Sequence, residues 1–257
     1  MTDVSSETEF TEEQMTLLGH LNELRIRLTW AFASILLMTI ISFIFAEPLL
    51  DFLLSPYNNA IQSSAQLQTL RPTEGIETFF KVSLMAGAIL SMPMILYQLW
   101  LFISPGLTTE ERRYVYVFVP SALVLFLLGI AFAWFILAPA AIFFLAGFLP
   151  DIFKTDWTGQ EYIGFLTRML FWLGVSFELP VVVYFMARVG LVTSQVLREQ
   201  WRIAVVTVAV LAAVITPSID PVTMLLTMAP LLVLYAMSIL LARVGYRQFE
   251  ARMAVDG

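Results

Sequence analysis

The sequence predicts an all-α polytopic membrane protein with six transmembrane helices. Hydrophobic residues make up 59% of the 257 residues and charged residues only 13%, which is more apolar surface than a soluble domain of this length buries. The apolar residues gather in six runs, and about 20 apolar residues are enough to cross a bilayer as an α-helix. The chain has no cysteine, so disulfide and thiol chemistry are excluded.

The first four apolar runs are long enough to cross the membrane on their own. They cover residues 28–46, 78–103, 114–138 and 162–187, and a proline follows each of the first three within two residues. Proline ends helices because it has no N–H to donate. The fourth run contains Glu178 and Pro180, and we expect this proline to bend the helix and to free a backbone carbonyl beside the glutamate.

Two further apolar runs follow at residues 203–215 and 222–242, and the tight turn TPSIDP (216–221) separates them. Thirteen residues rise only about 20 Å as an α-helix, less than the hydrocarbon core of about 30 Å. We therefore expect the fifth helix to be short. Asp220 before Pro221 is typical of a helix N-cap followed by proline at the first helical position.

Two long loops, 47–77 and 139–161, lie on the side opposite the termini and carry the apolar patches LLDFLL and AAIFFLAGFL. The second patch is too short to span again, so we expect it to lie as a cap along the membrane interface. We divide the chain into an acidic cytoplasmic tail (1–15), a single six-helix transmembrane domain (16–245) and a cytoplasmic C-terminal tail (246–257). Because the N-terminus is acidic and polar, we do not expect it to be a cleavable signal peptide.

The distribution of basic residues predicts the orientation. An even number of spans places both termini on one side, and only four of the fourteen Lys and Arg residues then lie on the other side: Arg71, Lys81, Lys154 and Arg168. Because cytoplasmic loops are rich in Lys and Arg, both termini are expected in the cytoplasm.

The segment HLNELRIRL (20–28) places leucines on one helical face and polar residues on the other. His20, Glu23 and Arg27 share the polar face. Residues 11–14, TEEQ, fit a capping box that opens this helix. An interfacial helix with a Glu23–Arg27 pair worth a few tenths of a kcal/mol explains the pattern without any binding function.

The segment SPGLTTEERR (104–113) contains two carboxylates on the same predicted face as Glu23. Glu110 and Glu111 fit the first turn of a helix that Thr108 caps, so each charge here also has a structural explanation. Glu23 and Glu111 together would nevertheless hold a basic partner.

Glu178 is harder to explain as a structural residue. A carboxylate in hydrocarbon costs about 3 kcal/mol or more unless it is protonated, paired or hydrated, and such residues face a cavity or the bundle interior. The alternative is a neutral glutamate that hydrogen-bonds to a neighbouring helix.

Four segments in order resemble the TatC family, the polytopic core subunit of the twin-arginine protein translocase. They are HLNELRIRL, SPGLTTEERR, GVSFELP (174–180) and TPSIDP, and the resemblance covers about residues 16–245. It implies a cup-like bundle of six helices with a concave face, two short final helices and a periplasmic cap. It also implies a signal-peptide receptor rather than an enzyme, in a bacterial cytoplasmic or thylakoid-type membrane.

The resemblance also assigns site residues and partners. Glu23 and Glu111, with Glu110, Arg25 and Phe102 beside them, would bind the paired arginines of a signal peptide on a folded cargo protein. Pro56, Glu178, Pro180 and Asp220 match sensitive positions in the membrane, and Glu178 would line the hollow. Partners would be TatA- and TatB-like single-span proteins, other copies of the chain and membrane lipids. Ala236 departs from the family, since many relatives have glutamate near this position.

The sequence excludes or disfavours several other functions. The net charge of −6 argues against nucleic acid, and no metal cluster, nucleotide motif or nucleophile–base pair indicates an enzyme or a cofactor. The resemblance to the TatC family then implies that the energy for export comes from the proton gradient. The alternative is a proton-coupled small-solute transporter that uses Glu178, with a faint repeat as its remnant. The repeat matches Gly87, Pro93 and Tyr97 with Gly174, Pro180 and Tyr184.

Overall fold

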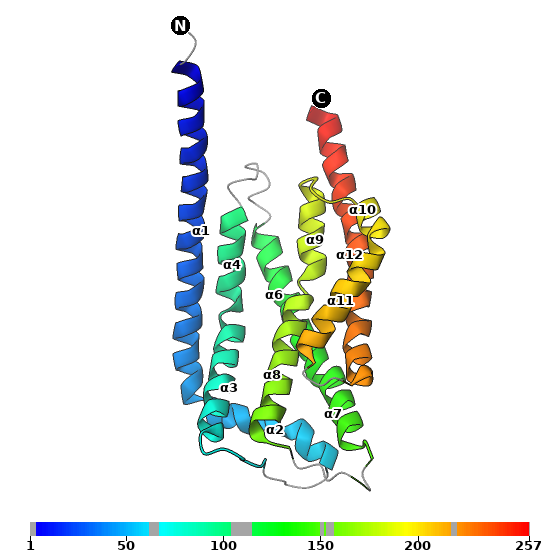
Figure 1. The fold of residues 1–257 in the computed structure, drawn as a ribbon. Helices are drawn as coiled ribbons and strands as arrows, with labels where there is room; N and C mark the ends of the chain where they lie inside the picture. Colours follow the sequence, from blue (N-terminus) through cyan, green and yellow to red (C-terminus); the bar gives the residue numbers. More distant parts are fainter. Residues whose placement is uncertain are drawn as a thin grey trace.

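The computed structural model is a bundle of helices in which the first helix begins and the last helix ends at the same end of the molecule (Figure 1). It describes residues 4–61, 67–103, 115–149, 152, 157–216 and 220–256. Apart from an isolated β-bridge between Gln68 and Thr158, the regular structure of these residues is helical. We call the end with the chain termini the terminal end and the opposite one the distal end.

The spans lie where the apolar runs predicted them. Four stretches are long and apolar enough to cross a membrane: Gly19–Ile44, Phe118–Ala146, Gly159–Arg188 and Pro221–Ala251. The second predicted span is a pair of helices, α3 (Glu74–Leu90) and α4 (Met92–Ile103), bent by 50°. The fifth is the shorter apolar helix α11 (Trp201–Ile215), which follows α10 (Ser194–Glu199). The prediction of an all-α polytopic fold is confirmed.

The helices at the two ends of the chain are longer than predicted. Helix α1 (Val4–Ile44) includes residues 11–14, so these do not begin a helix as the capping box implied. Helix α12 (Pro221–Asp256) has 36 residues, so the prediction of two short final helices holds only for α11. Arg243 and Arg247 follow the apolar run, and because arginine is a good helix former the helix continues past it toward the terminal end.

Only one of the two apolar patches lies across the end of the bundle. The first patch is in α2 (Ala46–Ile61), which crosses the distal end (Figure 1). The second patch, α7 (Ala138–Ala146), continues the third span from α6 (Val115–Phe132) through the π-helical turn η2 (Ala133–Leu137). The span was expected to stop before Pro139, but a π turn accommodates the proline without ending the helix.

The fourth span is the centre of the bundle. It consists of α8 (Gly159–Ser176) and α9 (Leu179–Arg188), and the helix is interrupted at Phe177 and Glu178, just before the proline at which a bend is expected. Twelve of the 18 residues of α8 are buried. Gly174 of α8 and Gly129 of α6 let these helices approach closely, because a Cβ on Gly129 would lie 2.9 Å from the Cα of Gly174.

Candidate functional site

At the terminal end, α1 turns Glu23 and Arg27 toward the bundle and its leucines outward. Arg27 donates a hydrogen bond to Glu23 at 3.3 Å, and both side chains are 28–29% exposed. Leu21, Leu24 and Leu28 are 60%, 40% and 66% exposed. The predicted Glu23–Arg27 pair is therefore present, and the leucine stripe is left for lipid or a partner rather than for the bundle.

Helix α4 completes this part of the site. The rings of His20 and Phe102 stack with centroids 4.6 Å apart and an interplanar angle of 21°. His20 lies one turn before Glu23 on the same helical face, so the stack brings Phe102 to the side of α1 that carries the carboxylate. Arg25 is exposed, and residues two apart on a helix do not face each other, so it projects from another side.

Glu110 and Glu111 lie in the segment 104–114, outside the residues that the structure describes. The segment connects α4, which ends at Ile103, to α6, which begins at Val115. Both of these helix ends are at the terminal end of the bundle (Figure 1). The proximity of Glu110 and Glu111 to Glu23 stays a prediction.

Glu178 lies at the break in the fourth span. Its residue is 8% exposed, and its Oε1 is buried without a hydrogen-bond partner among the described residues. Its backbone carbonyl accepts hydrogen bonds from Val181 and Val182 at 3.1 and 3.0 Å, while Pro180 has no N–H to continue the pattern. The side chain lines none of the three cavities of 330–510 Å³ described for this bundle, so its place in a hollow stays a prediction.

Asp220 and Pro56 occupy separate positions. Asp220 caps α12 as predicted: its Oδ1 accepts a hydrogen bond from the backbone N–H of Thr223 at 2.7 Å, and its Oδ2 accepts one from the Thr223 hydroxyl. Pro56 lies inside α2 and lines a cavity of about 510 Å³ with Trp134 and Phe143. These two residues thus belong to other elements than the break in the fourth span that holds Glu178 and Pro180.

Sequence reasoning missed a network of hydrogen bonds around Glu74 at the distal end, which we call the Glu74 network. Glu74 is only 2% exposed, and its carboxylate accepts hydrogen bonds from the N–H groups of Leu70 at 2.8 Å and of Gln160 at 3.0 Å. Arg71 also donates to the Gln160 side chain. The Glu74 network joins the segment before α3 to the start of α8. Its partners are 86 residues apart in the chain, and no local spacing indicates them.

The described residues contain no group of three or more His, Cys, Asp or Glu side chains suited to hold a metal. What this end of the molecule offers chemically is a half-buried carboxylate beside an aromatic stack. Such a site suits the recognition of a cation, because a carboxylate accepts charge-assisted hydrogen bonds and aromatic faces attract cations.

Comparison with known proteins relates the chain to one family. The family model described as "Sec-independent protein translocase protein (TatC)" matches residues 19–230. The TatC protein of Helicobacter pylori is 38% identical over 224 residues, covering 87% of this chain and 86% of the relative. TatCy of Bacillus subtilis is 33% identical over 250 residues and 97% of each chain.

The fold also matches a solved structure. The crystal structure of a twin-arginine translocase receptor, TatC, superposes with a TM-score of 0.82 at 34% sequence identity. The match covers 88% of this chain and 99% of that one. A likeness at this identity and coverage extends over the six predicted spans, not over one motif.

Proposed function

This chain belongs to the TatC family of Sec-independent protein translocase proteins, and on that premise we propose that the face between α1 and α4 binds the twin-arginine signal peptide of the cargo protein. In this proposal Glu23, with Glu110 and Glu111, receives the paired arginines, and Phe102 flanks them. The alternative of a proton-coupled small-solute transporter is not supported, since the matching family and the relatives named above are translocase proteins.

One observation carries the proposal: the carboxylate of Glu23 is half-buried against the bundle and only partly used. Its Oε1 accepts from Arg27, and no described residue donates to its Oε2. A guanidinium forms two parallel hydrogen bonds to a carboxylate, a geometry that lysine cannot reproduce. An arginine of the signal peptide therefore gains a bond that the Arg27 pair leaves unmade, and it competes with Arg27 for the other.

The charges supply selectivity rather than most of the affinity. An ion pair in contact with water yields about 1 kcal/mol or less, so two such pairs are too weak to hold a cargo. The remainder comes from the apolar segment that follows the arginines, which buries its side chains in the membrane.

Partners and orientation follow from the same proposal. Both termini lie in the cytoplasm, so that the Glu23 face meets signal peptides before export. The short helix α11 leaves part of the membrane thickness unspanned, and TatA- and TatB-like single-span proteins and further copies of the chain assemble around the bundle. The proton gradient supplies the energy for export, and Glu178 acts within the membrane.

The test is site-specific crosslinking of a signal peptide to residue 102. We expect an Arg-Arg signal to crosslink to the wild-type chain and a Lys-Lys signal to crosslink poorly. Glu23→Gln should weaken the Arg-Arg signal about fivefold, which corresponds to a loss of about 1 kcal/mol. Glu199→Gln is the matched control, because Glu199 is an exposed glutamate at the same end of the molecule on α10. Equal crosslinking of both signals contradicts the proposal.

A further inference from the structure

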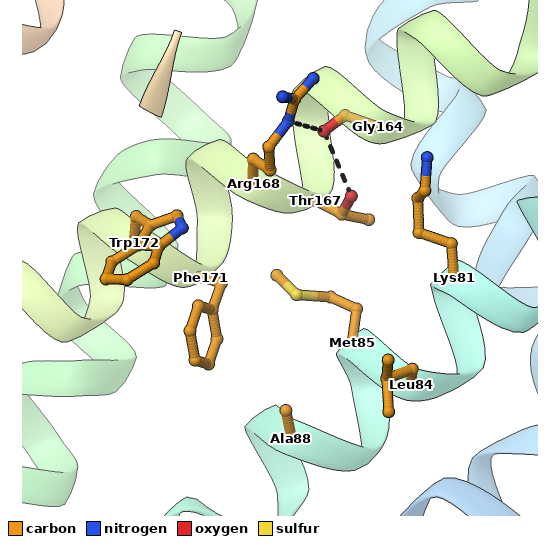
Figure 2. Close-up of a pocket in the computed structure, with 9 residues that line it drawn as sticks. All are labelled: Lys81, Leu84, Met85, Ala88, Gly164, Thr167, Arg168, Phe171 and Trp172. Carbon is orange, nitrogen blue, oxygen red and sulfur yellow. Dashed lines mark hydrogen bonds between the residues drawn. The ribbon is translucent and has the colours of Figure 1, made fainter. Parts of the chain in front are cut away.

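A cavity between α3 and α8 has two cations at one side and an apolar lining on the other. Its volume is about 510 Å³. Lys81 of α3 and Arg168 of α8 supply the charges, and Leu84, Met85, Phe171 and Trp172 contribute the apolar surface. Figure 2 shows both basic side chains directed toward the same side of the cavity, near Gly164.

The two cations converge on one small volume. A Cβ placed on Gly164 would lie 3.1 Å from Nζ of Lys81 and 3.9 Å from a terminal nitrogen of Arg168. The two nitrogens are therefore at most about 7 Å apart. Two charge-assisted hydrogen bonds of about 2.8 Å to different oxygens of one phosphate span a gap of this size.

No anion of the described chain neutralises this pair. The cavity lining contains no carboxylate, and neither cation takes part in an ion pair with a described residue. Arg168 donates its Nε–H to the carbonyl of Gly164 at 2.9 Å, which holds the guanidinium in place and leaves its terminal nitrogens for a ligand. Unpaired cations in membrane spans are costly, so such groups usually meet a counter-charge.

The depth of the pair matches the head group of a lipid. Lys81 is seven residues from the start of α3 and Arg168 nine residues from the start of α8, about 10 and 13 Å along the helices. Both starts are at the distal end (Figure 1). Long basic side chains extend from such positions toward the membrane surface, while the apolar lining of the cavity continues toward the membrane centre.

We propose that this cavity binds an anionic phospholipid of the distal leaflet, with its phosphate between Lys81 and Arg168 and an acyl chain against Leu84, Met85, Phe171 and Trp172. The occupant combines the two chemistries that the cavity presents, negative charge at one side and a hydrocarbon chain at the other. Basic pockets between transmembrane helices recognise lipid head groups in this way. Gly164 has a defined role, since a side chain there would occupy the space of the phosphate-binding nitrogens.

The experiment uses the purified chain in phosphatidylcholine vesicles that contain phosphatidylglycerol, followed by extraction into detergent and native mass spectrometry of the retained lipid. We expect the wild-type chain to retain phosphatidylglycerol and the double variant Lys81→Gln, Arg168→Gln to retain about 30-fold less. The matched control is Arg198→Gln with Arg202→Gln, which removes two exposed cations at the other end of the molecule. It should retain the lipid as the wild type does.

Two further measurements distinguish the contribution of the two charges to lipid retention from that of the acyl chain. Lys81→Arg with Arg168→Lys keeps both charges and should keep the lipid, which excludes misfolding as the cause of the loss. An excess of inorganic phosphate should not displace the lipid, because free phosphate lacks the acyl chain. Undiminished retention by the double glutamine variant, equal loss in the control, or displacement by phosphate alone overturns the proposal.

Discussion

At the scale of single residues, Glu178 carries a cost that the fold does not offset. A buried polar atom without a hydrogen bond destabilises a protein by about 1–3 kcal/mol, and Oε1 of Glu178 is such an atom among the described residues. The break at Pro180 explains why the helix is interrupted here, but it does not require an acidic residue. A residue whose buried polar atom has no hydrogen-bond partner is a candidate for a functional role.

We predict that stability and export respond in opposite directions to changes of Glu178. Glu178→Leu removes the unpaired oxygen, so the free energy of unfolding should rise by about 1–3 kcal/mol while export of a twin-arginine reporter slows. Glu178→Gln keeps a polar side chain of the same shape, and it should preserve signal-peptide binding and slow export less. Thermal unfolding in detergent and export in cells measure the two effects. Wild-type export by the leucine variant would show that the carboxylate is dispensable.

Residues whose roles depend on near neighbours in the chain were predictable from the sequence. The pairing of Glu23 with Arg27 follows from a spacing of four, and the cap formed by Asp220 follows from the proline after it. Glu74 was not predictable, since it accepts a hydrogen bond from a backbone group 86 residues away. The convergence of Lys81 and Arg168 was missed for the same reason: only the packing of α3 on α8 brings them together.

At the scale of elements, the positions of the helices were predictable and their exact ends were not. Hydropathy identifies where apolar residues run, and it placed the fourth span and α11 within a few residues. It does not report whether a helix continues outside the apolar run, as α12 does, or whether a proline is absorbed by a π turn, as Pro139 is.

The breaks in the second and fourth spans share one local arrangement. In each span the helix is interrupted two residues before a proline, at Ser91 before Pro93 and at Glu178 before Pro180. The faint repeat noted in the sequence therefore corresponds to a structural similarity. The similarity arises because proline has no N–H to donate and interrupts helices, so it does not support the transporter alternative.

The docking of α1 depends on a close contact with α3. The span of α1 is only 6% buried, and a Cβ on Gly87 would lie 2.6 Å from the backbone of Thr39. We predict that Gly87→Ala destabilises the protein by about 1–3 kcal/mol, because backbone atoms must move to admit the methyl group. Signal-peptide crosslinking at residue 102 should fall as well, since α1 carries Glu23.

Gly75 provides the matched control for this prediction. It lies in the first turn of the same helix α3, and a Cβ there would meet nothing within 4 Å. Gly75→Ala should be neutral or slightly stabilising, because alanine is the better helix former. Equal melting temperatures for the two variants in detergent would mean that α1 is not held at Gly87.

At the scale of the whole molecule, the two ends differ in the number of basic residues and in their proposed functions. The basic residues whose side chains the structure describes at the terminal end are Arg25, Arg27, Arg188, Arg198, Arg202, Arg243 and Arg247, against Arg71, Lys81 and Arg168 toward the distal end. This asymmetry predicts a cytoplasmic terminal end. The proposed functions depend on that orientation, because signal peptides must reach Glu23 from the cytoplasm and the distal cavity must face the outer leaflet.

The orientation can be tested directly because the chain has no cysteine of its own. Glu77 and Glu199 are both exposed glutamates, at the start of α3 and at the end of α10, and these two helix ends lie at opposite ends of the bundle (Figure 1). We predict that a membrane-impermeant maleimide labels Glu77→Cys in intact cells and labels Glu199→Cys only after the cells are lysed. Each variant is the control for the other, since both replace an exposed acid whose loss costs little. The opposite labelling pattern would place Glu23 outside the cell, where no signal peptide awaiting export could reach it, and the receptor proposal would then be wrong whatever the local geometry of the site.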